Sequence, residues 1–285
     1  MKLVNDFLDY EILDMANGEK LERWGNVTLV RPDPEIIWPV KTHPELWDNV
    51  DAHYYRSNKG GGTWEVYNKK LDSWTINYKD LTFNLKLMGF KHTGLFPEQA
   101  YNWNYLDNVI KPGDKVLNLF AYTGAASVKA LSLGASVVHV DSSKGMIDWA
   151  KENVKASGLE DKPIRFLVDD CIKFVKREIR RGNKYDVIIL DPPSFGRGSN
   201  GEVWDINKDL YPLLNDLCEL LSDNVKMVLV NSYTTGLSKT VIEDLLNLTV
   251  NKKIPGTIES DELGIKMKDS NLILPCGIYA RWTKL

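Results

Sequence analysis

The strongest constraint on the fold is a regular alternation of two kinds of segment that begins near residue 115. Short and largely apolar runs cover residues 115–120, 136–141, 164–170, 185–191 and 225–231. Segments with helical patterns separate these runs, at residues 124–134, 142–158, 171–182 and 205–221. Apolar runs of this kind are typical of strands that are covered on both faces. The repeated alternation therefore predicts an α/β fold with a parallel, doubly wound sheet.

Residues 1–88 have a different composition. They contain five of the nine tryptophans together with many β-branched residues. Asn17-Gly18, between two short runs, is a type I′ hairpin signal. Further short strands are predicted over residues 64–69, 74–78 and 81–88, and prolines break the segment that precedes them. We therefore predict a small β-rich domain over residues 1–88 and a Rossmann-like domain over residues 89–285.

The tryptophans of the β-rich segment allow two interpretations. They could form a compact core, or they could present a surface on which nucleic-acid bases stack. We also expect this domain to lie beside the active site and to help select the substrate.

The composition limits the classes of protein that need to be considered. No apolar run approaches the roughly 18 residues of a membrane-spanning helix, so we expect no membrane contact. The three cysteines and four histidines show no metal-ligand spacing, so we expect no metal, and the cysteines fit a reducing cytoplasm. The net charge of −3 argues mildly against a large nucleic-acid footprint, but it leaves room for a local basic face.

Polar residues follow the predicted strands at the positions where ligands bind in open parallel sheets. The first strand is followed by a loop that ends at Gly124, and the next three strands end at Asp141, Asp170 and Asp191. A single acid at such a position is often a helix cap. Three acids at successive strand ends favour a ligand site.

The first loop argues against a dinucleotide and favours S-adenosylmethionine. It lacks the G-x-G-x-x-G pattern that closes on a pyrophosphate, because only Gly124 is present. S-adenosylmethionine has no phosphate, and Asn118 and Gly124 suit its amino-acid portion. Asp141 lies 17 residues after Gly124, near the roughly 20-residue offset of a ribose-binding acid. Asp170 would accept the amine of the adenine.

The stretch from Asp191 to Phe195 reads Asp-Pro-Pro-Ser-Phe and is the sharpest local signal. Pro192 and Pro193 remove two backbone donors and stiffen the loop. A planar base could stack on Phe195 while Asp191 accepts a hydrogen bond from its edge. We therefore predict that Asp191, Pro192, Pro193 and Phe195 are the catalytic residues. The alternative interpretation is a rigid turn between a strand and a helix.

At these residues the chain resembles the class I methyltransferases related to the large-subunit ribosomal RNA methyltransferases I and K. The resemblance rests on residues 93–99, 117–124, 140–143, 169–170 and 191–195. It implies a sheet of seven strands with the last one antiparallel, and S-adenosyl-L-methionine as cofactor. The cofactor contacts that it implies are Gln99, Asn118, Phe120, Tyr122, Gly124, Asp141, Ser142, Asp170 and Asp191.

The sequence departs from this family in two places. We cannot match residues 1–88 to the RNA-binding PUA domain that many members carry. The members that methylate cytosine at C5 have a cysteine after the fifth strand, and here that place reads Asn231-Ser232-Tyr233-Thr234. Because attack on cytosine C6 needs a thiolate, we expect direct methyl transfer without a cysteine adduct.

The sequence does not identify the molecule that accepts the methyl group. We expect a base in ribosomal RNA, and the alternatives are a small molecule or a protein as acceptor, or a nucleotide-binding module without catalysis. The basic residues of segment 171–182 have two interpretations, since such a run is often a solvated helix face but could also follow a phosphate backbone. The sequence does not determine the oligomeric state.

Overall fold

The computed structural model describes residues 1–57, 61–198 and 201–285. The chain forms two compact units. The large unit contains Met1, Asn102–Leu263 and Gly277–Leu285, and the small unit contains Lys2–Tyr101 and Gly264–Cys276. The domain boundary that we predict from the sequence, after residue 88, stays a prediction.

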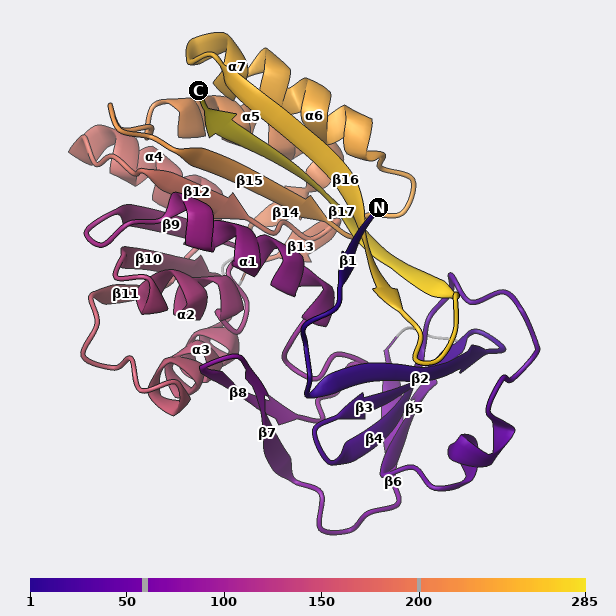
Figure 1. Cartoon of the computed structure of the whole chain (residues 1–285). Helices are drawn as coiled ribbons and strands as arrows, with labels where there is room; N and C mark the ends of the chain where they lie inside the picture. Colours follow the sequence, from indigo (N-terminus) through magenta and orange to yellow (C-terminus); the bar gives the residue numbers. More distant parts are fainter. Residues whose placement is uncertain (58–60, 199–200) are drawn as a thin grey trace. The chain divides into compact units, whose positions relative to one another are not determined.

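A mixed sheet of eight strands has the order β1-β16-β17-β15-β12-β9-β10-β11 (Figure 1). Neighbouring strands from β15 to β11 are all parallel, and β17 is antiparallel to β15. The bounds are Lys2–Val4 (β1), Lys115–Leu119 (β9), Ser136–Asp141 (β10), Ile164–Val168 (β11), Val187–Leu190 (β12), Met227–Ser232 (β15), Gly256–Lys266 (β16) and Ile273–Lys284 (β17). The predicted Rossmann-like sheet is confirmed, including its antiparallel last strand. The short edge strand β1 was not predicted.

Helices cover both faces of this sheet (Figure 1). Their bounds are Ala100–Val109 (α1), Ala125–Ser132 (α2), Lys144–Ala156 (α3), Cys171–Arg181 (α4), Ile206–Cys218 (α5), Lys239–Leu248 (α6) and Val250–Lys253 (α7). Helices α4 to α7 bury one face, where Phe174, Leu213 and Leu246 pack in one core with Leu190 and Val230. Because both faces are covered, the strands read as apolar runs in the sequence.

The helix boundaries follow capping chemistry. The side chains of Ser143, Asp170, Asp205 and Ser238 accept backbone N–H groups at helix starts. The helix predicted over residues 205–221 ends earlier, at Cys218. The residues that follow pair with the chain before β12 instead, since the Tyr185 N–H bonds to the Leu220 carbonyl at 2.8 Å and Tyr185 forms a bridge with Leu221. No helix among the described residues is long and apolar enough to cross a membrane.

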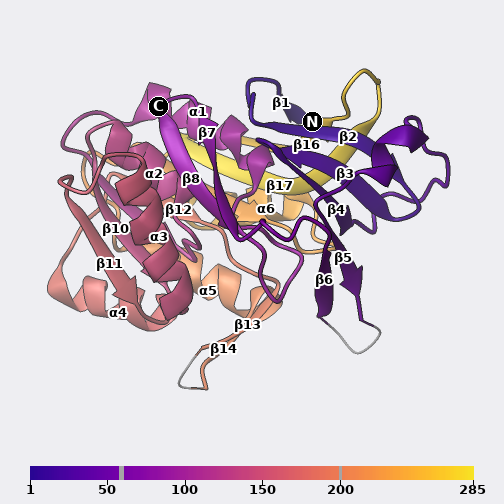
Figure 2. The ribbon, with the colours of Figure 1, turned by 90° about the horizontal axis from the view of Figure 1, so that it is seen from below.

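The small unit is rich in β-structure, as predicted (Figure 2). A five-stranded sheet has the order β2-β3-β4-β5-β6, and β7 pairs with β8. The bounds are Tyr10–Ala16 (β2), Glu19–Trp24 (β3), Val27–Pro32 (β4), Ala52–Arg56 (β5), Gly62–Val66 (β6), Ser73–Tyr78 (β7) and Leu81–Lys86 (β8), with short 3-10 helices at Pro44–Asp48 (η1) and Pro97–Gln99 (η2). Asn17 and Gly18 have φ of 54° and 76°, as a type I′ turn requires. Of the five tryptophans, only Trp24 is fully buried.

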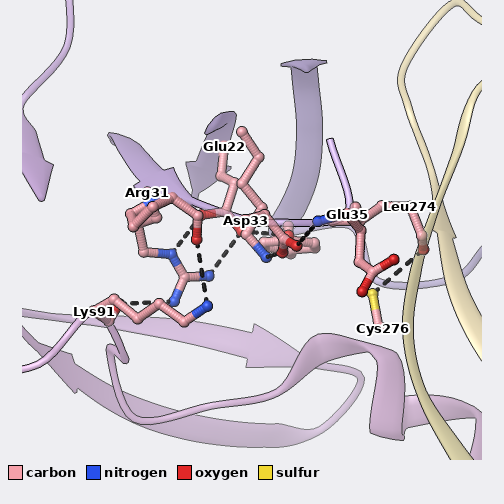
Figure 3. Close-up of polar contacts among 10 residues, drawn as sticks. Glu22, Arg31, Asp33, Glu35, Lys91, Leu274 and Cys276 are labelled. Carbon is pink, nitrogen blue, oxygen red and sulfur yellow. Dashed lines mark hydrogen bonds and ion pairs between the residues drawn. The ribbon is translucent and has the colours of Figure 1, made fainter. Parts of the chain in front are cut away.

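A buried ion pair joins two neighbouring strands of the small unit, β3 and β4 (Figure 3). The Arg31 guanidinium donates to both oxygens of Glu22, at 2.6 and 2.8 Å, and the Tyr10 hydroxyl donates to the same carboxylate at 2.6 Å. Burial alone would raise the pKa of Glu22, but the nearby charges of Arg31 and Lys20 lower it to about 2. Glu22 is therefore ionised in the folded protein at neutral pH.

We expect Glu22→Gln to destabilise the small unit strongly, because it leaves the buried Arg31 without a charged partner. The expected loss is about 3–5 kcal/mol in the free energy of unfolding. The folded pKa of Glu22 lies below its unfolded value, so its contribution is complete above that unfolded value and is lost as the pH falls toward about 2. Urea unfolding of the whole chain at neutral and acid pH measures both effects.

The matched control is Glu11→Gln, which removes a partly exposed carboxylate that pairs with Arg23 and Lys268. An exposed pair of this kind contributes about 1 kcal/mol or less. Equal losses for the two variants would show that the buried pair has no special role.

Candidate functional site

Four parallel strands of the large unit end at the same edge of the sheet. The central strand β9 pairs with β10 on one side and with β12 on the other, and Asn118 lies opposite both His139 and Ile189. The loops that follow β9, β10 and β12 therefore begin close together. These are the loops in which the sequence predicts the cofactor and the catalytic residues.

The loop after β9 has an unusual backbone. Phe120 and Tyr122 have φ of 53° and 52°, although neither is a glycine, and Gly124 has φ of 84°. Side chains rarely adopt this left-handed conformation, and such strain is common at ligand sites. A Cβ atom at Gly124 would lie 3.0 Å from Cβ of Ala150 and 3.1 Å from Cε1 of His139. Both distances are shorter than ordinary van der Waals contact, and the positive φ also favours glycine. Helix α2 begins at the next residue.

Buried polar side chains support this loop from below. The Asn118 amide donates to Oγ of Ser127 at 2.9 Å, and this hydroxyl lies 2.9 Å from Nδ1 of His139. All three residues are almost completely buried. Burial lowers the pKa of His139 to about 3, so the imidazole is neutral at physiological pH. Asn118 thus holds the first turn of α2, and its predicted cofactor contact stays a prediction.

Asp141 joins the loops that follow β9 and β10. Its two oxygens accept the backbone N–H groups of Tyr122 and Ser143, each at 2.9 Å. Burial raises the pKa of Asp141, although these two amides oppose the shift. The side chain is therefore fixed at the strand end, where the sequence predicts a ribose-binding acid. Ser142 is exposed between Asp141 and the cap residue Ser143.

The acids after β11 have structural partners. The Asp170 carboxylate accepts the Lys173 N–H at 2.9 Å as the cap of α4. Asp169 forms an ion pair with Arg177 of the same helix. Asp170 thus serves as a helix cap, and its predicted contact with the adenine stays a prediction.

The loop after β12 leads into a hairpin that the sequence did not reveal. Strand β13 (Phe195–Arg197) pairs with β14 (Val203–Asp205), which runs directly into α5 (Figure 2). The Ser194 hydroxyl lies 2.8 Å from that of Thr234, in the loop after β15. The Pro193 carbonyl accepts the Trp204 indole N–H at 2.6 Å.

The loop after β12 exposes some of its side chains to solvent and buries others. Phe195 is 55% exposed, and the Arg197 guanidinium lies 5.8 Å from the centre of its ring. Pro193 is also exposed, while Pro192 is buried and Asp191 is partly buried. The backbone N–H of Asp191 bonds to the Leu119 carbonyl at 3.3 Å, which ties the loop to the end of β9.

Gln99 and Asn231 lie outside the loops that follow β9, β10 and β12. Gln99 ends η2 in the small unit and is buried there, so its predicted cofactor contact stays a prediction. Asn231, the first residue of the stretch 231–234 in which the sequence analysis finds Tyr233 in place of a cysteine, is buried and accepts the Asn102 amide at 3.0 Å. Among the described residues, no three His, Cys, Asp or Glu side chains gather in a group that could hold a metal ion.

Comparison with known proteins supplies the family. The family of S-adenosylmethionine-dependent methyltransferases matches residues 39–244. This chain belongs to that family. The match covers the loops after β9, β10, β11 and β12, and the family is the methyltransferase family with the cofactor that the sequence predicts.

Similar proteins include a crystal structure of an S-adenosylmethionine-dependent methyltransferase from Agrobacterium tumefaciens. It is 35% identical, covers 99% of this chain and 93% of its own, and has a TM-score of 0.92. The ribosomal RNA large subunit methyltransferase K/L of Shewanella woodyi is 34% identical over 87% of this chain and 34% of its own length. The protein of the same name from Shewanella frigidimarina is 35% identical over 67% of this chain and 26% of its own. The chain thus spans about a quarter to a third of the length of these two relatives.

The close packing around Gly124 generates a prediction for cofactor binding. Gly124→Ala introduces both a left-handed alanine and a clash with Ala150 and His139. The strain alone costs about 1–2 kcal/mol, and the clash should also displace the loop. We expect the variant to bind S-adenosylmethionine at least about tenfold more weakly, because a lost contact to a charged group is worth about 1.5 kcal/mol or more.

Gly182→Ala is the control. Gly182 has φ of +69°, but nothing lies within 4 Å of a Cβ at this position, so this variant has the strain without the clash. Calorimetry with S-adenosylmethionine compares the two proteins. Equal affinity of the two variants for the cofactor would contradict the proposed place of the Gly124 loop.

Proposed function

We propose that S-adenosylmethionine binds at the loops after β9 and β10, with Asp141 accepting the ribose hydroxyls. The chemistry of the residues there suits this cofactor. The Asp141 carboxylate is fixed by two amides and retains lone pairs that can accept hydroxyl groups. Asn118, Phe120, Tyr122 and Gly124 would surround the amino-acid portion. Ser142, Gln99 and Oδ2 of Asp170 are the remaining proposed contacts.

We further propose that the acceptor is a base in ribosomal RNA. The observation that carries this proposal is the rigid loop after β12, which ends in the exposed ring of Phe195 with Arg197 beside it. A base can stack on an aromatic ring, and a guanidinium suits both the ring and a phosphate. Two relatives that are 34–35% identical are named ribosomal RNA large subunit methyltransferases. An acceptor of this kind would place the enzyme in the cytoplasm.

The basic face of α4 supports an RNA acceptor only in part. Lys173, Arg177 and Arg181 form ion pairs with Glu202, Asp169 and Glu178. Among the described residues, Lys176 and Arg180 are exposed and make no ion pair. Three of the five basic side chains of α4 are therefore already paired with acids of the same protein. Lys176 and Arg180 remain as cations for a phosphate backbone.

The transfer that we propose needs alignment more than activation. The bound cofactor supplies an electrophilic methyl group. Phe195 would stack on the acceptor base, and Asp191 would orient its edge or accept its proton. The base must first leave its stack, at a cost of a few kcal/mol. A lone pair on a base nitrogen would then take the methyl group as its bond to the cofactor sulfur breaks, so that S-adenosylhomocysteine leaves and the proton of the nitrogen passes to Asp191.

The cysteines are poorly suited to an alternative mechanism through a covalent adduct. Cys171 and Cys218 are buried in the large unit. Burial raises the pKa of Cys218 to about 11 and raises that of Cys171 further. Burial also raises the pKa of Cys276, in the small unit. A nucleophilic cysteine requires a thiolate, so these environments favour direct transfer.

Asp141→Asn tests the proposed cofactor site. Losing a charged acceptor for two hydroxyl groups should cost about 1.5–3 kcal/mol, a decrease in affinity of roughly 10- to 150-fold. Titration calorimetry with S-adenosylmethionine measures this change. Asp148→Asn, an exposed position of α3, is the control and should leave the affinity unchanged. If Asp141→Asn binds as tightly as the control, Asp141 is not part of the site.

The proposed acceptor is tested by nucleoside mass spectrometry of ribosomal RNA from cells with and without the gene. We expect one methylated base to disappear and to return when the purified protein and S-adenosylmethionine are added. Asp191→Ala should lose most of this activity, whereas replacing Cys171, Cys218 and Cys276 with serine should preserve it in a folded protein. Unchanged RNA would point to a small-molecule or protein acceptor. A 5-methylcytosine product or a protein–RNA adduct would contradict direct transfer.

A further inference from the structure

Trp204 is a large buried side chain between the two loops of the proposed site, and the sequence did not single it out. It lies on β14, opposite Gly196 of β13, and is only 6% exposed. Phe195 and Arg197 lie on the other face of the same hairpin, since neighbouring residues of a strand alternate in direction. The hairpin therefore has an outer face toward solvent and an inner face that carries Trp204.

The indole N–H of Trp204 fixes the loop after β12. It donates to the Pro193 carbonyl at 2.6 Å. Pro192 and Pro193 have no N–H groups with which this loop could be held. At these two prolines the backbone can be held only through its carbonyls, and the Ile206 N–H adds a bond at 3.1 Å to the carbonyl of the next residue, Ser194. The indole contact lies two residues after Asp191.

The ring of Trp204 also packs against the loop after β9. The centre of its ring lies 4.7 Å from that of Phe120, with the planes tilted by 55°. Phe120 has φ of 53°, a conformation that persists only where neighbouring groups hold it. Its backbone N–H donates to Sγ of Cys171 at 3.4 Å. The packing on Trp204 and this bond to Cys171 together hold Phe120 in place.

We infer that Trp204 is a positioning residue that holds the cofactor loop and the acceptor loop in one fixed arrangement. The indole N–H aligns the acceptor loop, and the ring supports Phe120 in the cofactor loop. The backbone that follows Trp204 is fixed, because Asp205 caps α5 and Ile206 is buried in the core. The inference uses the methyltransferase activity of the family and the proposed cofactor loop, and it does not depend on the identity of the acceptor.

Two substitutions separate the two contacts. Trp204→Phe retains an aromatic ring and removes the N–H, so amide exchange over residues 190–198 should accelerate about tenfold, as expected for the loss of a buried hydrogen bond. S-adenosylmethionine should bind this variant with normal affinity. Trp204→Leu also removes the aromatic packing, and the affinity for S-adenosylmethionine should fall about two- to tenfold, the range for an aromatic pair. Hydrogen-exchange mass spectrometry and calorimetry give the two readouts.

Trp282→Phe is the matched control. Trp282 is also completely buried in the large unit and donates its indole N–H to Asn251 at 3.2 Å, away from both loops. This variant should lose a similar amount of thermal stability without a change in exchange over residues 190–198 or in cofactor affinity. The inference is wrong if Trp204→Phe exchanges like the wild type, or if Trp282→Phe accelerates exchange to the same extent. If Asp141→Asn and Trp204→Leu both bind the cofactor normally, the proposed cofactor site fails; if only Trp204→Leu does, the positioning role fails.

Discussion

The parallel pairing of β9 with β10 and β12 is the constraint on which the site depends. Three chain segments that are far apart in sequence end at one edge because their strands run in the same direction. The Asp141 carboxylate then connects two of these ends through the Tyr122 and Ser143 amides. Without this pairing, no local sequence motif could assemble the site.

Next to this edge of the sheet, buried polar side chains fix loops whose conformation depends on contacts with other parts of the chain. Asn118, Ser127 and His139 form a connected set under the loop that ends at Gly124. Such buried groups are tolerated because they bond to one another. Trp204 has the corresponding role for the loop after β12. We therefore expect substitutions in this supporting layer to affect cofactor and acceptor binding as well as stability.

Much of the fold was predictable because its local signals agree with its overall arrangement. The apolar strand runs, the helical segments between them and the Asn17-Gly18 turn were all predicted from the sequence and are found in the structure. The resemblance to a methyltransferase family also identified the cofactor, because the residues that carry it follow the strands of the sheet.

Other features were not predictable, for physical reasons. Glu22 and Arg31 read as surface charges of a strand, and only the folded sheet shows that they form a buried pair. The hairpin of β13 and β14 is too short to give a periodic pattern, so Trp204 lacked a sequence signal. Asp170 shows the converse difficulty, since a helix cap and a cofactor ligand call for the same residue type at the same position.

A crystal structure of the enzyme with S-adenosylhomocysteine, the product of the cofactor, tests the proposed site most directly. We expect the ribose at the Asp141 carboxylate, the amino-acid portion at the loop from Phe120 to Gly124, and the sulfur facing the loop that begins at Asp191. A cofactor product bound away from the ends of β9 and β10 would contradict the proposed site.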